Sequence, residues 1–68
     1  MLDSSIIGMV VDYGDYRCVI DNILDYKEEI IQLRITSGKY DGFSFSVTLM
    51  EGARLVDDEW HTKIVYDK

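Results

Sequence analysis

The chain has 68 residues, of which 47% are hydrophobic and 29% are charged, and its formal net charge is −6. A chain this short leaves little room for a deep substrate cavity, and its acidic balance argues against direct binding to nucleic acids or anionic membranes, which require basic surfaces. We therefore expect a single small domain, residues 1–68, whose function lies on its surface.

The cysteine content and the N-terminal residues indicate the cellular compartment in which we expect the protein. Cys18 is the one cysteine, so neither an internal disulfide nor a cysteine-based metal site is possible. The first residues carry Asp3 and no basic residue, and the apolar stretch 6–11 is too short for a secretory or membrane segment. We expect a cytoplasmic protein, in its producer or in a host that it enters, with no cofactor.

The stretch "GMVVDYGDYRCVI", residues 8–20, predicts a β-hairpin. With Gly14-Asp15 as a two-residue turn of type II′ or I′, Tyr13 faces Tyr16 and Asp12 faces Arg17. A slip of one residue would turn that charged pair inward, so the register is well specified. The residues expected on the core face are Ile7, Met9, Val11, Tyr13, Tyr16, Cys18 and Ile20.

The next segment, "DNILDYKEEIIQLR", fits two structures. Ile23, Tyr26, Ile30 and Leu33 recur at helical spacing, and Asp21 could cap a helix there. The chain is rich in β-branched residues, however, which suit a pleated sheet better than a helix. We favour an all-β fold, with an α+β domain carrying a helix near 22–33 as the alternative.

Three further segments alternate between apolar and polar residues, as half-buried strands do. The inward positions of the first two are Ile31, Leu33 and Ile35, then Phe43, Phe45, Val47 and Leu49. A loop over residues 50–52, with Gly52 in the left-handed conformation, would pair Leu49 with Ala53 and Val47 with Leu55. The inward positions of a last strand would be Trp60, Thr62, Ile64 and Tyr66.

Five or six short antiparallel strands in so short a chain predict a small β-barrel, either SH3-like or OB-like. Within "ITSGKYDGFSFSV", residues 35–47, a hydrophobic residue precedes a Gly-Lys-aromatic-x-Gly run. This stretch is similar to the KOW motif of ribosomal and transcription-factor SH3-like barrels, and the matching residues are Ile35, Gly38, Lys39, Tyr40, Gly42 and Val47. The resemblance implies a turn between two barrel strands. It departs from the family at Phe45, where a glycine is expected, and the acidic chain gives no support for RNA binding.

Catalytic and metal-binding patterns are not evident. The registers send Cys18 into the core and His61 outward, so the two do not form a nucleophilic pair. The contiguous acids Asp57, Asp58 and Glu59 lack the alternate spacing and central glycine of a calcium loop. We expect a protein that is not an enzyme, with no metal site, and we read the acidic run as a solvated turn.

Aromatic residues beside charges in loops are common anchors of protein interfaces. The alternative for each tyrosine is that its ring closes a small core while its hydroxyl stays in water. The expected partner-binding residues are Tyr13, Asp15, Tyr16, Tyr40, Asp57, Asp58, Glu59 and Trp60. They predict a non-catalytic protein-interaction module whose partner has a basic surface. Because the chain lacks proline, a homodimer through an edge strand is also plausible.

A second hypothesis uses the acidic groups themselves. Asp21, Asp25, Glu28 and Glu29 form one group, and residues 57–59 form another. Carboxylates at phosphate-like spacing could imitate a nucleic acid and block the basic cleft of a nucleic-acid enzyme, as a small phage-encoded inhibitor would. The competing interpretation is a solubilising acidic surface.

Overall fold

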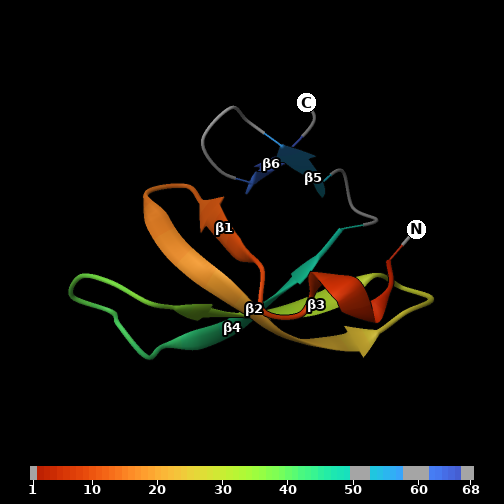
Figure 1. Cartoon of the computed structure of the whole chain (residues 1–68), viewed down its shortest axis with the longest axis horizontal. Helices are drawn as coiled ribbons and strands as arrows, with labels where there is room; N and C mark the ends of the chain where they lie inside the picture. The colour runs from red at the N-terminus through yellow and green to blue at the C-terminus, as the bar shows by residue number, and fades with distance from the viewer. Residues whose placement is uncertain (1, 50–52, 58–61, 67–68) are drawn as a thin grey trace.

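The computed structural model describes residues 2–49, 53–57 and 62–66. A short 3-10 helix, η1 (Ser4–Ile6), precedes six strands (Figure 1). The strands are β1 (Val10–Tyr13), β2 (Tyr16–Asp25), β3 (Ile30–Ile35), β4 (Ser44–Thr48), β5 (Ala53–Asp57) and β6 (Thr62–Tyr66). The all-β prediction is confirmed.

The first hairpin forms in the predicted register. Val11 pairs with Cys18, Asp12 with Arg17, and Tyr13 with Tyr16. Arg17 Nε donates to Asp12 Oδ1 at 3.2 Å, as the cross-strand pairing requires. The local pattern of apolar residues and the tight turn are therefore sufficient to specify this hairpin.

The segment 22–33 is a strand, a turn and a second strand, so the helical alternative is wrong. The register of β2 on β3 shifts between Ile20 and Asn22 and again between Ile23 and Asp25. Each bulge adds one residue to β2 and changes which residues face the core. Buried positions consequently step from Ile20 to Ile23, a spacing of three that imitates a helix in the sequence.

The strands β3 and β4 pair as neighbours and bury the predicted faces in part. Ile31, Leu33 and Val47 are buried, as expected. Phe43, however, is 59% exposed, so its prediction as a core residue is wrong. The ring of Phe43 stacks on Phe45, whose side chain is half-buried, but it precedes β4 at the end of the sheet, where the core has ended.

All six strands belong to one sheet, in the order β4-β3-β2-β1-β6-β5. The sheet is open in the part of the chain described, so the predicted small β-barrel is not closed, and its SH3-like or OB-like type stays a prediction. Strand β1 pairs with β6 in parallel, which corrects the expectation of antiparallel pairs throughout.

The predicted pairing of Leu49 with Ala53 and of Val47 with Leu55 is also wrong. Ala53 pairs with Tyr66, and Leu55 pairs with Ile64. Followed through the ladders, β4 and β5 both run opposite to β1, so these two strands point the same way and cannot form a hairpin. The loop predicted over 50–52 lies outside the described residues.

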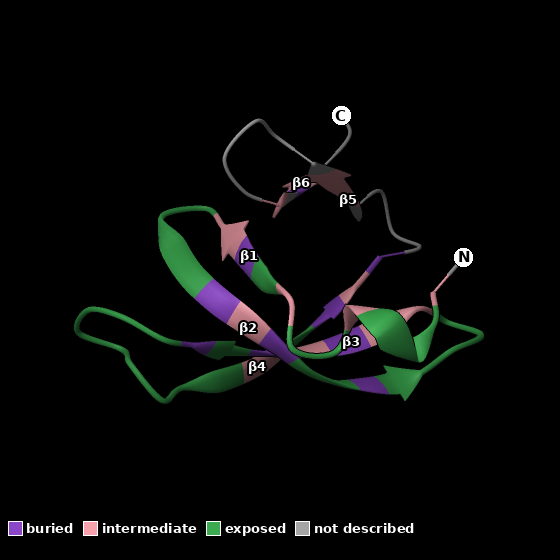
Figure 2. Cartoon of the chain, viewed as in Figure 1, coloured by how far each residue is buried: buried purple, intermediate pink, exposed green. Residues whose placement is uncertain are grey.

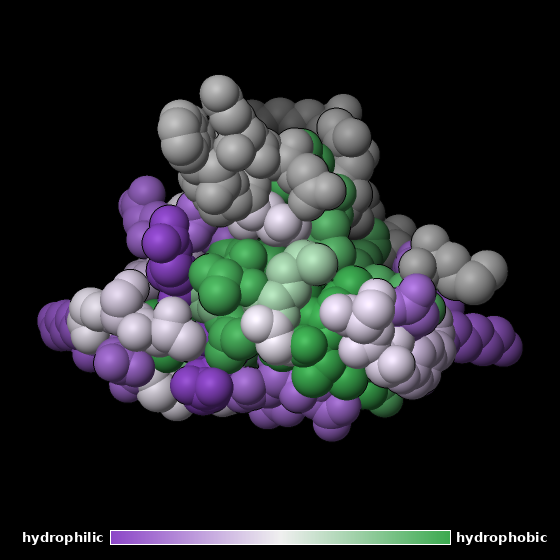
Figure 3. Space-filling view, in the orientation of Figure 1, coloured by the Kyte–Doolittle hydropathy of each residue, from purple (hydrophilic) through white to green (hydrophobic). Residues whose placement is uncertain are grey.

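The core lies along the middle of the sheet (Figure 2). Val11, Cys18, Ile20, Ile31 and Leu33 are fully buried, and they come from three adjacent strands. On the face shown in Figure 3, hydrophobic residues gather near the centre while hydrophilic residues occupy both ends of the long axis. The prediction that Ile7 and Tyr16 face the core is wrong, because their exposed fractions are 43% and 41%.

None of the described residues forms a helix with the length and apolar content needed to cross a membrane.

Candidate functional site

The tip of the first hairpin holds Tyr13 and Tyr16 opposite each other. The backbone φ of Gly14 is +60°, whereas the φ of Asp15 is not positive. A positive φ at the first turn residue alone is the signature of a type II′ turn. This turn directs both tyrosines to the same side of the hairpin, the side that faces the loop between β3 and β4.

That loop, residues 36–43, is anchored at both ends. At its start, the Thr36 amide and hydroxyl both donate to the Arg17 carbonyl, at 2.9 and 3.2 Å. At its end, the Gly42 amide donates to the Ile35 carbonyl while the Ile35 amide donates to the Phe43 carbonyl. Gly42 and Phe43 on one strand thus oppose the single residue Ile35 on the other. The φ of +93° at Gly42 fits a glycine bulge at this point. The turn implied by the KOW resemblance is present.

The hairpin tip and this loop enclose an apolar cleft of about 340 Å³, here called the aromatic cleft. Its lining residues are Tyr13, Tyr16, Ile35, Tyr40, Phe43 and Phe45. Its volume is at the lower end of the range for ligand pockets, about 300–1,000 Å³. The aromatic cleft therefore has room for one or two side chains of a partner.

Ring contacts hold the walls of the aromatic cleft in place. Tyr16 and Tyr40 meet edge to face, with centroids 5.9 Å apart and an interplanar angle of 75°. Tyr13 and Phe45 lie 5.2 Å apart, and Phe43 stacks on Phe45 at 6.5 Å. Such pairs contribute about 0.5–1.5 kcal/mol each beyond burial. The cleft is thus preformed by contacts between segments that are distant in the sequence.

The rim of the aromatic cleft is accessible. Tyr16, Tyr40 and Phe43 are 41%, 48% and 59% exposed, which is unusual for three adjacent aromatic rings. No charged residue lines the cleft among those described, but Lys39 Nζ lies 5.7 Å from the centroid of the Tyr40 ring. An ammonium group at this distance is within range of a cation–π interaction.

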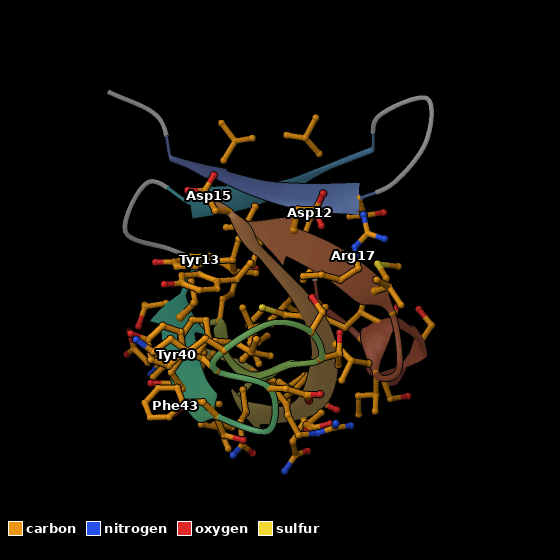
Figure 4. The ribbon with its side chains drawn as sticks, turned by 90° about the vertical axis from the view of Figure 1, so that its left-hand side faces the viewer. Asp12, Tyr13, Asp15, Arg17, Tyr40 and Phe43 are labelled. Atoms are coloured by element: carbon orange, nitrogen blue, oxygen red, sulfur yellow. The ribbon has the colours of Figure 1, made fainter. Side chains whose placement is uncertain are left out.

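A second, polar recess lies beside the first. It is lined by Asp12, Gly14, Asp15, Arg17 and Ser37. In Figure 4, Tyr13, Tyr40 and Phe43 lie along one side of the view with Asp15 above them, whereas Asp12 and Arg17 lie apart. Asp15 does not line the aromatic cleft. It lies beside the cleft at the tip of the hairpin, and we call this position the acidic rim.

Cys18 lies in the core and not in a site. It is fully buried, and its Sγ lies 3.9 Å from the carbonyl oxygen of Tyr16. Burial raises the pKa of the Cys18 thiol, and the nearby Asp12 carboxylate raises that pKa further. A buried, protonated thiol behaves as a small hydrophobic group and a poor nucleophile. His61 lies outside the described residues.

The two predicted acidic groups differ in what can be described. In the first, Arg34 donates to both carboxylate oxygens of Asp21 at 3.0 and 3.3 Å. Asp25 accepts from the amides of Lys27 and Glu28 at 2.9 and 3.0 Å. Two of its four carboxylates therefore have structural roles. No group of three or more His, Cys, Asp or Glu side chains suitable for a metal ion occurs among the described residues.

Of the predicted site residues, Tyr13, Tyr16 and Tyr40 come together in the aromatic cleft. Asp57 ends β5, where its backbone pairs with Thr62, and residues 58–60 lie outside the described part of the chain. Phe43 and Phe45, which the alternation of the sequence places in the core, also line the cleft. The glycine that precedes Phe43 was the available signal, because a bulge there ends the regular alternation.

Comparisons of the chain with protein-family models, with curated proteins and with solved structures find no match.

Proposed function

We propose that this protein is a non-catalytic interaction module that binds a partner protein through the aromatic cleft and the acidic rim beside it. The observation that carries the proposal is the cluster of exposed rings from Tyr16, Tyr40 and Phe43 around an apolar cleft. Aromatic anchors in a partly desolvated pocket, surrounded by polar residues, are the usual energetic centre of a protein interface.

Charge defines the class of partner. The chain carries a net charge of −6, and Asp15 lies at the tip of the hairpin next to the cleft. A basic surface would be attracted to this acidic chain, Asp15 would contribute to that attraction beside the cleft, and the attraction would weaken as salt is added. The setting we propose is the cytoplasm, in keeping with the single, buried cysteine.

The alternative function, a nucleic-acid mimic that inhibits an enzyme, has less support. A mimic needs carboxylates that are free to replace phosphates, and in the first acidic group Asp21 is paired with Arg34 while Asp25 caps the turn that follows β2. Competition by duplex DNA or RNA for the partner would favour the mimic, whereas binding that nucleic acid does not affect would favour the module.

The test compares three proteins immobilised for capture from a native lysate. They are the wild type, the Tyr16→Ala/Tyr40→Ala variant and a Tyr26→Ala control. Tyr26 is 56% exposed and lies in the turn between β2 and β3, at the opposite end of the molecule from the loop 36–43 (Figure 1). We expect the same partner with the wild type and the control, and at least about tenfold weaker affinity for the double variant, since each lost anchor costs 1 kcal/mol or more.

Circular dichroism and thermal melting establish that each variant is folded before capture. A folded Tyr16→Ala/Tyr40→Ala variant with full affinity for the captured partner would refute the aromatic cleft as the contact surface.

A further inference from the structure

The outer edge of β4 adjoins the aromatic cleft, and within the described ranges 2–49, 53–57 and 62–66 it carries none of the usual protections against strand pairing. Strand β4 reads Ser-Phe-Ser-Val-Thr, with no charge and no proline. Natural edge strands are commonly protected by lysine, proline, an interrupting bulge or a covering segment. The bulge at Gly42 precedes this edge and does not interrupt it, and no described strand other than β3 pairs with β4.

The ladder between β3 and β4 determines which backbone groups point outward. The Ile35 amide donates to the Phe43 carbonyl, and the Leu49 amide donates to the Glu29 carbonyl. Hydrogen-bonded residues alternate along an antiparallel ladder, so Phe45 and Val47 also direct their backbone groups at β3. The amides and carbonyls of Ser44, Ser46 and Thr48 therefore point away from the sheet, where another strand can reach them.

The cleft lies on the face of β4 to which Phe45 belongs. In a strand added antiparallel to this edge, the residue opposite Phe45 would occupy a non-hydrogen-bonded pair, because Ser44 and Ser46 make the hydrogen bonds to the added strand. Side chains in such pairs approach most closely. The side chain of that residue would therefore lie against Phe45 and at the mouth of the aromatic cleft.

We propose that an extended segment of the partner protein adds to the outer edge of β4 and places a lysine or arginine side chain against the rings of the aromatic cleft. This inference rests on the proposed function and deepens it. Main-chain hydrogen bonds supply affinity in strand addition, and pockets for alternate side chains supply specificity. The cation is chosen by the net charge of −6 and by the faces of the exposed rings of Tyr16, Tyr40 and Phe43, which attract cations.

A second copy of this chain fits the same edge less well. Pairing two copies through β4 would bring together two chains that each carry a net charge of −6. The strand of the copy would also contribute only serine, phenylalanine, valine and threonine, so it has no cation to offer the rings. Charge complementarity therefore selects a basic peptide segment over a homodimer.

The probe is a displayed library of random heptapeptides, selected on the immobilised protein. We expect enrichment of peptides with one lysine or arginine flanked by β-branched residues. The enriched peptide is then synthesised with a methyl group on one backbone nitrogen at a time. Methylation should abolish binding at every second position, because only alternate amides of an added strand bond to β4.

The matched protein variants are Ser46→Pro and Ser46→Ala. Proline removes the outward amide of Ser46 without removing a bond to β3, whereas alanine keeps that amide. We expect roughly tenfold weaker peptide binding for Ser46→Pro, the upper range for one lost backbone hydrogen bond, and no change for Ser46→Ala. If Ser46→Pro fails to fold, the methylated peptides still decide the question.

Several outcomes would overturn the inference. These are no enriched peptide, enriched peptides without a basic residue, methylation effects that do not alternate, and a wild-type dimer in light scattering that Ser46→Pro dissociates. If Tyr16→Ala/Tyr40→Ala loses the captured partner while a folded Ser46→Pro keeps it, the proposed function stands and the strand-addition inference fails.

Discussion

The rings of Tyr13 and Phe45 are in contact, with centroids 5.2 Å apart and planes tilted by 56°. They belong to β1 and β4, which β2 and β3 separate in the sheet. Three steps across a flat sheet would hold side chains on one face roughly 14 Å apart, since neighbouring strands are spaced by about 4.8 Å. The contact therefore requires that the sheet coil strongly, and this curvature creates the aromatic cleft.

Coupling between these two rings can be measured by a double-mutant cycle. We expect Tyr13→Ala and Phe45→Ala to be non-additive by about 0.5–1.5 kcal/mol in the free energy of unfolding, because each substitution alone already removes the ring contact. Urea denaturation gives the four free energies. Tyr13→Ala with Tyr26→Ala is the control pair and should be additive within about 0.5 kcal/mol. Equal additivity in both pairs would contradict the role of the contact in holding the sheet coiled.

Two leucines on adjacent strands provide a matched test of the core. Leu33 is fully buried in β3, whereas Leu24 is 52% exposed in β2. Leu33→Ala should lower the free energy of unfolding by about 2–5 kcal/mol, because it removes buried methyl groups and leaves a cavity. Leu24→Ala should lower it by less than about 1 kcal/mol. Thermal or urea unfolding of both variants checks the difference, and similar losses would show that the burial assigned to β2 and β3 is incorrect.

The turn between β2 and β3 contains a strained residue. Glu29 has a φ of +55°, a conformation that costs a non-glycine residue roughly 1–2 kcal/mol. Glu29→Gly relieves that strain but adds freedom to the unfolded chain, so we expect a net gain of up to about 1 kcal/mol in unfolding free energy. Glu28→Gly is the control, since Glu28 lacks a positive φ. It should be destabilising, and a stabilising Glu28→Gly or a destabilising Glu29→Gly would contradict the assigned turn.

The buried thiol of Cys18 predicts a dependence of stability on alkaline pH. Burial raises the pKa of this thiol in the folded protein, so the folded state keeps its proton at a pH where the unfolded state, with a pKa of about 8.5, has lost it. The free energy of unfolding should therefore fall as the pH rises past that value. The Cys18→Ala variant has no thiol at this position. The difference in unfolding free energy between the wild type and this variant, measured as a function of pH, therefore gives the contribution of the thiol.

Thiol alkylation gives an independent measurement of the same group. At pH 8, iodoacetamide should modify Cys18 much more slowly in the native protein than in urea, because the thiolate is the nucleophile and the native thiol is both buried and protonated. Equal rates in the two conditions would mean that Cys18 is accessible in the folded state.

The sequence by itself determined the first hairpin and the inward faces of β3. The turn at Gly14-Asp15 and the pairing of Val11 with Cys18 depend on residues close together in the chain, and a period of two specifies a face without reference to any other strand. The three tyrosines of the aromatic cleft could also be named, because they lie beside charged residues at predicted turns, where aromatic residues commonly anchor interfaces.

Only the tertiary structure decided which strands are neighbours. Alternation is the same whether β5 pairs with β4 or with β6, so the sequence pattern could not reveal the parallel contact of β1 with β6. The bulges in β2 likewise shift the buried face by one residue and imitate a helix. The cleft itself depends on the coiling of the whole sheet, which brings Tyr13 to Phe45 and Tyr16 to Tyr40, and that curvature is the sum of contacts between residues far apart in the chain.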